Sequence, residues 1–282
     1  MFTTIVNYLL DSRDRQRIAI ALIKGNAMRQ ARQIELTNPI TWEFSGFSQN
    51  GEDGIIEVLR KQLRSSNRYF VEIGASNGVE NNSAWLVVAE RYKGLMIEGD
   101  ARLVKRANRN IAIYSIGAQC KAMFVTVETT SAILKLIRHR DPDVFSLDID
   151  GNDYHVAQAL MNGGLRPKII VVEYNSAYGP DRELSIAYRP DFSVRQAHSS
   201  RLYYGVSIAG WRKFFETKGY RFVTVDQNGV NAFFVDPVWF DSSFIDNIQG
   251  AEFVENQAQL CAHGVSNEEQ FAIIKDQKFS QI

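Results

Sequence analysis

Residues 68–78, RYFVEIGASNG, decide the fold of this chain. They form a short, nearly continuous apolar run that closes on Glu72 and Gly74 and then opens, past Ser76 and Gly78, toward a helix-like stretch. Gly74 lets the chain turn sharply, and Gly78 lets the backbone approach a ligand closely. Free amide groups at such a turn can hold an anionic or carboxyl group. Turns of this kind also occur without a ligand, so the run by itself indicates a strand that leads into a helix.

Four more β-rich runs follow, each separated from the next by a helix-like stretch. The runs are GLMIEGD (94–100), KAMFVTV (121–127), VFSLDID (144–150) and IIVVEYN (169–175), and the helix-like stretches are 80–92, 101–109, 129–140 and 153–163. Nearly continuous apolar strands are typical of a sheet that is buried on both faces. The alternation of strands and helices therefore predicts a doubly wound, mostly parallel α/β sheet with right-handed crossovers.

Two further runs predict a different end to the sheet. A helix-like stretch around 205–218 precedes YRFVTVD (220–226) and NAFFVD (231–236), and Asn228 and Gly229 lie between these two runs. An Asn-Gly pair between β-rich runs is a hairpin signal. We expect an antiparallel C-terminal hairpin at the edge of the mostly parallel sheet.

Length and composition limit the class of protein. The 282 residues lie near the upper end of what one hydrophobic core fills, and 45% hydrophobic with 23% charged residues is typical of a globular domain. These values exclude a disordered chain, a collagen-like chain and a coiled-coil rod. The 32 basic and 32 acidic residues cancel, so no global field favours nucleic acid or an anionic membrane. The longest apolar runs, such as 18–23, have about six residues, whereas a membrane span needs about 20.

The two ends of the chain differ from its centre. Residues 1–44 alternate apolar and basic positions at helical spacing, and they predict a mildly basic helical arm that packs on the domain or contacts an oligomer partner or a membrane surface. Residues 45–240 are the expected central domain, and 241–282 predict a polar helical tail. The first residues lack a basic leader, and Cys120 and Cys261 make no disulfide framework. We expect a cytoplasmic protein whose oligomer contacts, where it forms them, use the arm or the tail.

The residues that close the strands are candidates for ligand binding, because in open α/β sheets the ligand lies beyond the carboxyl ends of the strands. The second run ends in Glu98, which lies 26 residues after Glu72. An acidic side chain at this place can accept hydrogen bonds from both hydroxyls of a ribose, or it can be a solvated strand end. Ser76 stands where a second glycine would admit a pyrophosphate, so the loop suits S-adenosylmethionine better than NAD.

The order and spacing of these motifs resemble the FkbM-like S-adenosylmethionine-dependent methyltransferases. The resemblance covers Phe47 to Asp236, and the segments that carry it are SQNGEDGII (48–56), FVEIGASNG (70–78), MIEGD (96–100), SLDIDGNDYHV (146–156), VVEYN (171–175) and NAFFV (231–235). It implies a class I methyltransferase fold with a pocket for S-adenosylmethionine, in which Glu98 binds the ribose. The other residues expected in the cofactor pocket are Gln49, Asp53, Glu72, Gly74, Ser76, Gly78 and Asp148.

A cluster of acidic residues follows the run at 144–150. Asp148, Asp150 and Asp153 lie in the segment LDIDGNDYH, and Glu173 ends the neighbouring run. Carboxylates that converge at one sheet edge repel each other unless they are protonated, hydrogen-bonded or bridged by a cation. Hard oxygen ligands of this kind suit Mg²⁺ or Ca²⁺. Two interpretations stay open: Asp148, Asp150 and Glu173 hold a divalent cation, or Asp153 caps a helix while Asp150 binds loop amides.

His155 follows in the same loop, beside these carboxylates. A histidine that titrates near neutral pH at a strand end is a candidate general base. A lone histidine is more often packed or exposed to solvent. If His155 is not the base, Asp150 of the same loop is the second candidate catalytic residue.

The stretch 176–204 is an insertion, rich in Tyr, Arg and Ser, after the run that ends in Glu173. Long loops at an active edge bind substrate or act as lids, and Tyr and Arg can stack on and hydrogen-bond a sugar. The expected substrate residues are Arg182, Arg189, Arg195 and His198. The alternative is an ordinary surface excursion.

The resemblance implies O-methylation of a hydroxyl on a sugar or another small polar metabolite, with S-adenosylmethionine as the methyl donor. Methyl transfer is an in-line displacement, so the enzyme must align the reacting atoms. An alcohol acceptor must also lose its proton, either to His155 or Asp150 as a base, or after a bound cation such as Mg²⁺ lowers its pKa. We expect no nucleic-acid partner and no membrane span. The alternatives are a non-catalytic scaffold with a cofactor fold and an NAD-dependent oxidoreductase.

Overall fold

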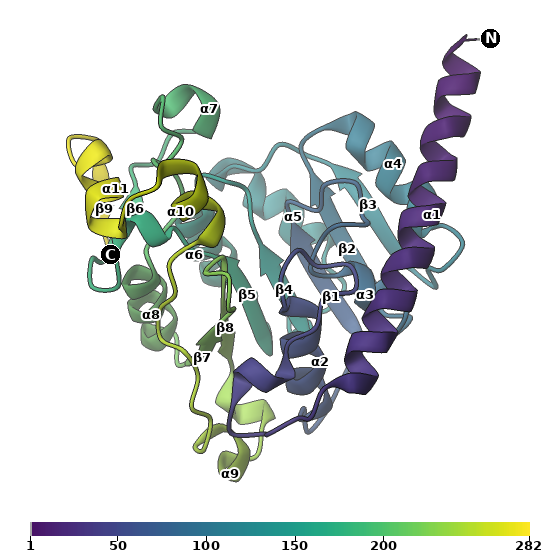
Figure 1. Ribbon diagram of the computed structural model, residues 1–282, viewed down its shortest axis with the longest axis horizontal. Helices are drawn as coiled ribbons and strands as arrows, with labels where there is room; N and C mark the ends of the chain where they lie inside the picture. Colours follow the sequence, from purple (N-terminus) through teal and green to yellow (C-terminus); the bar gives the residue numbers. More distant parts are fainter. Residues whose placement is uncertain (1) are drawn as a thin grey trace.

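The computed structural model describes the backbone of residues 2–282 and the side chains from Ser12 onward (Figure 1). A seven-stranded sheet runs through the molecule in the order β3-β2-β1-β4-β5-β8-β7. Its strands are β1 (Tyr69–Ile73), β2 (Lys93–Glu98), β3 (Ala118–Ala122), β4 (Val144–Leu147), β5 (Ile169–Glu173), β7 (Arg221–Val225) and β8 (Asn231–Val235). Strands β1 to β5 are parallel, and β8 is antiparallel to both β5 and β7. This is the class I Rossmann-like α/β fold with an antiparallel hairpin, and the predicted fold class is confirmed.

Helices cover both faces of the sheet because its strands are apolar on both sides. One face carries α2 (Glu52–Lys61), α3 (Ala84–Val88) and α4 (Ala101–Ile111), and the other carries α5 (Thr130–Leu136), α6 (Asp153–Asn162) and α8 (Ile208–Thr217). Successive strand residues alternate between the two cores: Phe70 of β1 belongs to the first and Val71 to the second. Each face therefore has a closed hydrophobic core, and the strand ends are left for the site.

Two predicted elements are shifted or shortened. The run 121–127 was expected to be a strand, but β3 ends at Ala122, because its register with β2 pairs Ala122 with Glu98, the last residue of that strand. Residues after Ala122 leave the sheet and instead line a cavity beside it. The helix expected over 80–92 is only α3, since the preceding residues form a turn.

The insertion and the C-terminal tail form one packed unit. Strand β6 (Leu184–Ile186) of the insertion pairs antiparallel with β9 (Phe279–Gln281) at the end of the tail. The short helices near this unit are α7 (Val194–Ala197), α10 (Gln257–His263) and α11 (Asn267–Ile274), whereas α9 (Ser242–Ile245) packs in the core beneath α2. Tyr178, Phe192 and Ile274 share a small apolar core of their own. The insertion is thus paired with the tail, and the tail, which was predicted to be helical, also contains a strand.

Residues 2–31 form one long helix, α1 (Phe2–Ala31), which runs along the outside of the molecule and packs against α4 (Figure 1). Buried Asp14 of α1 accepts hydrogen bonds from Arg106 and Asn110 of α4. Gly25 lies against the ring of Trp85, which fixes the orientation of the helix. Among the described helices, none is long and apolar enough to cross a membrane.

Candidate functional site

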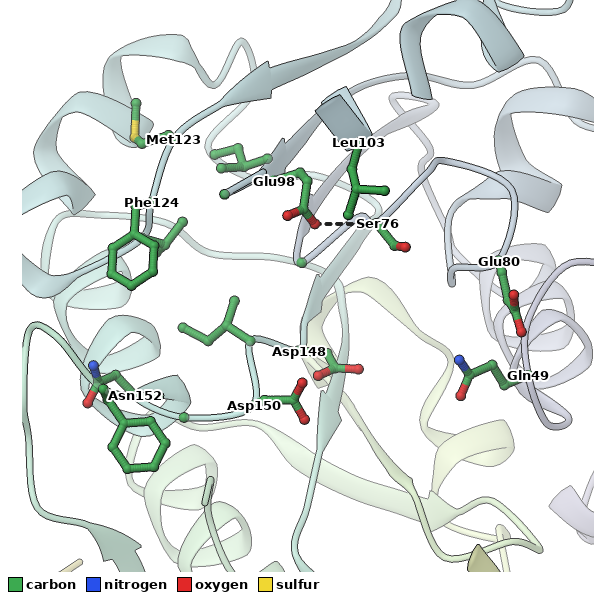
Figure 2. A pocket seen from close by; sticks show the side chains of 17 residues that line it. Gln49, Ser76, Glu80, Glu98, Leu103, Met123, Phe124, Asp148, Asp150 and Asn152 are labelled. Atoms are coloured by element: carbon green, nitrogen blue, oxygen red, sulfur yellow. Dashed lines mark hydrogen bonds between the residues drawn. The ribbon is translucent and has the colours of Figure 1, made fainter. Parts of the chain in front are cut away.

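A cavity of about 400 Å³ lies at the carboxyl ends of β1, β2 and β4, where this fold places its ligands (Figure 2). We call it the main cavity. Its lining comes from the β1 loop, the end of β2, the segment after β3 and the loop after β4. The side chains labelled in Figure 2 are Gln49, Ser76, Glu80, Glu98, Leu103, Met123, Phe124, Asp148, Asp150 and Asn152.

The β1 loop has the conformation that its glycines predict. Gly74 has φ +92°, and a Cβ atom there would lie 1.6 Å from the carbonyl oxygen of Asp148. Gly78 has φ +70° and lies against Ala107 of α4. Both positions favour glycine. The chain at the end of β4 lies close to Gly74, and α4 lies close to Gly78. Ser76 also has a positive φ, 49°, which turns its amide toward β2.

Glu98 is held in place by the backbone. Its Oε2 accepts a hydrogen bond from the Ser76 amide at 2.9 Å, and its Oε1 accepts one from the Asp100 amide at 2.8 Å. Each carboxylate oxygen can accept a further bond. The side chain lies in the main cavity (Figure 2). Glu98 is therefore a preorganised acceptor for a pair of hydroxyl groups.

Apolar side chains lie on either side of Glu98, and we call them the apolar wall (Figure 2). Leu103 of α4 contributes to it, together with Met123 and Phe124 from the segment after β3. The side chain of Phe124 is large, yet the residue is 60% exposed. A flat apolar surface beside a hydroxyl-binding carboxylate suits a nucleoside, whose planar base can pack on the ring.

Glu72 does not line the main cavity but a smaller one of about 50 Å³ beside it, which we call the annex. The main cavity and the annex share Gln49, Gly74, Glu80 and Asp148. Glu72 accepts hydrogen bonds from the Asn82 amide at 2.9 Å and from the Ser83 hydroxyl. Burial raises the pKa of Glu72 to about 7.

Residues that the sequence did not single out complete the annex. The side-chain oxygens of Asn81 and Asn231 are buried and accept no hydrogen bond, while their amide nitrogens donate to Ala75 and Glu52. The lining of the annex also includes Glu52, Glu72 and Glu80, and a lining rich in hydrogen-bond acceptors suits a donor such as an ammonium group. The polar run after Gly78 was the available signal for Asn81, and nothing local marked Asn231.

Gln49 and Asp53, both expected against the cofactor, have different positions. Gln49 lines the main cavity and the annex. The Asp53 carboxylate is buried and accepts hydrogen bonds from the amides of Gly46, Phe47 and Ser48. Asp53 shapes the loop that carries Gln49 and does not line either cavity.

Asp148, Asp150 and Glu173 come together at the ends of β4 and β5, with carboxylate oxygens within 4.8 Å of one another. Burial and the neighbouring carboxylates Asp150 and Asp153 raise the pKa of Asp148 to about 8. Burial and Asp148 raise the pKa of Glu173, and burial raises that of Asp150. Figure 2 shows Asp148 and Asp150 pointing into the cavity. At neutral pH the cluster requires shared protons or a cation.

Asp153 has a structural role in this loop. Its Oδ1 accepts a hydrogen bond from the Ile149 amide at 2.9 Å, and its Oδ2 accepts one from the Gly151 amide at 2.8 Å. Asn152 occupies the N-cap position of α6, one residue before the expected cap, and its side chain makes no capping hydrogen bond. Asp153, and not Asp150, is therefore the residue that binds the loop amides.

His155 points away from the main cavity. It lies on α6, and its Nε2 is 2.9 Å from the carbonyl oxygen of Ile186 in β6. Its ring packs edge-on against Tyr154 and Tyr188, and burial lowers its pKa. This placement removes the geometric basis for His155 as the general base and leaves Asp150 as the candidate that faces the cavity.

None of the four expected substrate residues lines the main cavity. Arg182 forms an ion pair with Glu268, Arg189 forms one with Asp191, and His198 bonds the Ser200 hydroxyl. Arg195 lies close enough to Asp150 for its charge to offset part of the rise that burial causes in the pKa of that carboxyl. The insertion residue that lines the cavity is Phe192, which was not predicted.

The sequence matches no protein-family model and no curated protein. Among solved structures, the chain is similar to an O-methyltransferase from Bacillus cereus in complex with SAH, at 14% identity and TM-score 0.40, covering 78% of this chain and 89% of that one. It is also similar to the O-methyltransferase TomG from Streptomyces achromogenes in complex with SAM, at 17% identity and TM-score 0.41, covering 65% and 77%. A third is the SAH-bound methyltransferase PaMTH1 from Podospora anserina, at 16% identity and TM-score 0.42, covering 66% and 76%. The fold itself is defined by the strand order of this chain.

Proposed function

We propose that this protein is an S-adenosylmethionine-dependent methyltransferase that acts on a hydroxyl group of a small polar acceptor. The observation that carries the proposal is Glu98, held by two backbone amides beside a glycine turn and facing an apolar wall. The FkbM-like resemblance supports a sugar as the acceptor class.

The site residues offer contacts for three parts of S-adenosylmethionine, namely the ribose, the adenine and the ammonium group. Glu98 would bind the ribose hydroxyls, and Phe124 with Met123 would pack on the adenine. The annex, whose lining includes Glu52, Glu72 and Glu80, would accept hydrogen bonds from the ammonium group. S-adenosylmethionine supplies a methyl group on a positively charged sulphur.

The charge of the site also suits this cofactor, whose sulphonium and ammonium groups outweigh its carboxylate. Among the described residues, those that line the two cavities include no Lys, Arg or His. They include six carboxylates, at Glu52, Glu72, Glu80, Glu98, Asp148 and Asp150. A dinucleotide, with its two phosphates, would face an unfavourable field in this cleft.

We further propose that Asp148, Asp150 and Glu173 hold a divalent cation such as Mg²⁺, which would lower the pKa of the acceptor hydroxyl. Their separation and mutual repulsion support this role. The alternative is that Asp150 takes the hydroxyl proton directly as a general base.

The test is transfer of a labelled methyl group from S-adenosylmethionine to a panel of sugars, with Mg²⁺ or with a chelator. We expect labelled product that survives mild alkali, as a methyl ether does and a methyl ester does not. Labelled product that forms equally well in the chelator would assign the proton transfer to Asp150. An absence of product with every hydroxyl acceptor, in protein that binds the cofactor, would favour a scaffold.

A further inference from the structure

Helices α1 and α4 carry a strong excess of positive charge in a chain whose formal net charge is zero. Helix α1 has five basic and two acidic residues, and α4 has four basic residues and no acidic one. Their combined net charge is therefore +7, and the rest of the chain carries −7. Because the two helices pack against each other, this charge lies on one side of the molecule (Figure 1).

The basic side chains of these helices face solvent. On α1 they are Arg13, Arg15, Arg17 and Lys24, and on α4 they are Lys105 and Arg109. The described acidic residue of the pair, Asp14, is buried and bonded to Arg106, so it does not offset the exposed charge. Arg15 and Arg109 line the same small hollow between the helices.

Large apolar side chains lie among these charges. Ile20 is 64% exposed, Ile23 is 72% exposed, and Ile113, just after α4, is 68% exposed. Gly25 packs against Trp85 on the inner side of α1, so the helix cannot rotate to bury Ile20 and Ile23 without losing that contact. We call the exposed set the α1–α4 surface: Arg13, Arg15, Arg17, Ile20, Ile23, Lys24, Lys105, Arg109 and Ile113.

We propose that the α1–α4 surface binds to the surface of anionic phospholipid bilayers without crossing them. Basic residues next to exposed apolar side chains on a helix are the combination that an anionic membrane interface binds. A nucleic acid would use the charges but not the isoleucines. A second copy of the chain would bring two basic rows together, and like charges repel. The inference does not depend on methyl transfer.

The experiment is co-sedimentation of the full chain with two kinds of vesicle, pure phosphatidylcholine and phosphatidylcholine with about 30% phosphatidylserine. We expect binding to the anionic vesicles only, and a decrease in binding at about 0.5 M salt because exposed charges are screened. Equal binding to both vesicles, or none to either, would overturn the proposal.

Two variants separate the charge from the apolar contact. Each basic residue near an anionic surface contributes about fivefold, so Arg15→Gln/Arg17→Gln/Lys105→Gln should lower the partition coefficient about 100-fold. Ile20→Gln/Ile23→Gln should also lower it, by at least about tenfold. The matched control removes three exposed lysines elsewhere, Lys135→Gln/Lys213→Gln/Lys275→Gln, and should bind as the wild type does.

Thermal unfolding of each variant checks that the substituted residues are dispensable for folding. An RNA oligonucleotide of about 20 nucleotides is the competing ligand. The membrane proposal is wrong if the isoleucine variant binds vesicles normally, or if the control loses as much binding as the basic-residue variant. It is also wrong if RNA binds tightly, displaces the protein from the vesicles, and does so equally well for the wild type and for Ile20→Gln/Ile23→Gln.

Discussion

Two groups of carboxylates at the carboxyl edge of the sheet, which we call its two halves, use the same type of side chain in opposite environments. At the end of β2, the Glu98 carboxylate accepts hydrogen bonds from two backbone amides. At the ends of β4 and β5, Asp148, Asp150 and Glu173 face one another, and their pKa values are raised. The first half is complete as it stands and can bind neutral hydroxyl groups. In the second half three carboxylates share the charge of Arg195 at Asp150, so at neutral pH it also needs protons or a cation.

The largest effect on stability is expected from a substitution at Gly74, where the two halves are in contact. Gly74→Ala would place a methyl group 1.6 Å from the Asp148 carbonyl oxygen, at φ +92°. We expect the free energy of unfolding to fall by about 4 kcal/mol or more. Gly164→Ala is the matched control, because Gly164 has φ +90° with nothing within 4 Å of the added Cβ, and it should cost about 1–3 kcal/mol. Equal losses in urea denaturation would show that the close approach to β4 is not a constraint.

The acidic half should make stability depend on pH. The pKa of Asp148 is about 8 in the folded chain and 3.8 as its usual value, so the folded state binds more protons between these limits. In a chelator, this group lowers the free energy of unfolding as pH rises from about 4 to about 8, by up to about 1.4 kcal/mol per pH unit. Asp148→Asn should flatten that dependence, and Asp276→Asn, at an exposed position, should not.

Addition of Mg²⁺ extends the same measurement. At pH 8, Mg²⁺ should stabilise the wild type and the Asp276→Asn control more than Asp148→Asn, because that variant lacks one oxygen ligand. Equal stabilisation of all three proteins would mean that the cation, if bound, is bound elsewhere.

A substitution at Glu98, in the half that is held by backbone amides, should change the affinity for the cofactor. Glu98→Ala should remove a paired contact with the ribose and weaken S-adenosylhomocysteine binding by about 1–3 kcal/mol in calorimetry. Glu128→Ala, an exposed carboxylate outside the cavity, is the control. Unchanged affinity of a folded Glu98→Ala protein would contradict the ribose assignment.

The smallest effect is expected at His155. Because its ring bonds the Ile186 carbonyl and lies outside the cavity, His155→Ala should cost about 1–2 kcal/mol of stability. Its kcat should stay within about threefold of the wild type, whereas loss of a general base costs about 10²–10⁴-fold. A fall of that size in the rate of methyl transfer would instead support His155 as the general base.

The same contrast explains what the sequence could reveal. Gly74, Gly78 and Glu98 were predictable, because local turns and strand register determine their positions. Asp148 and Glu173 were also predictable as neighbours, since parallel strands end at one edge of the sheet.

Other roles depend on contacts between distant segments. His155 faces β6, which is held in place by β9 at the far end of the chain. Asn81 and Asn231 meet in the annex although 150 residues separate them. Asp53 binds loop amides on its N-terminal side, and a helix pattern does not show in which direction its carboxylate points. These positions required the structure.

The central claim is that this cleft binds S-adenosylmethionine, and side-by-side calorimetric titration with S-adenosylhomocysteine and NADH tests it most directly. Because the cleft carries six carboxylates and suits a ribose without a pyrophosphate, we expect S-adenosylhomocysteine to bind at least about 100-fold more tightly than NADH. Tighter binding of NADH, or no binding of either ligand to the folded protein, would contradict the account.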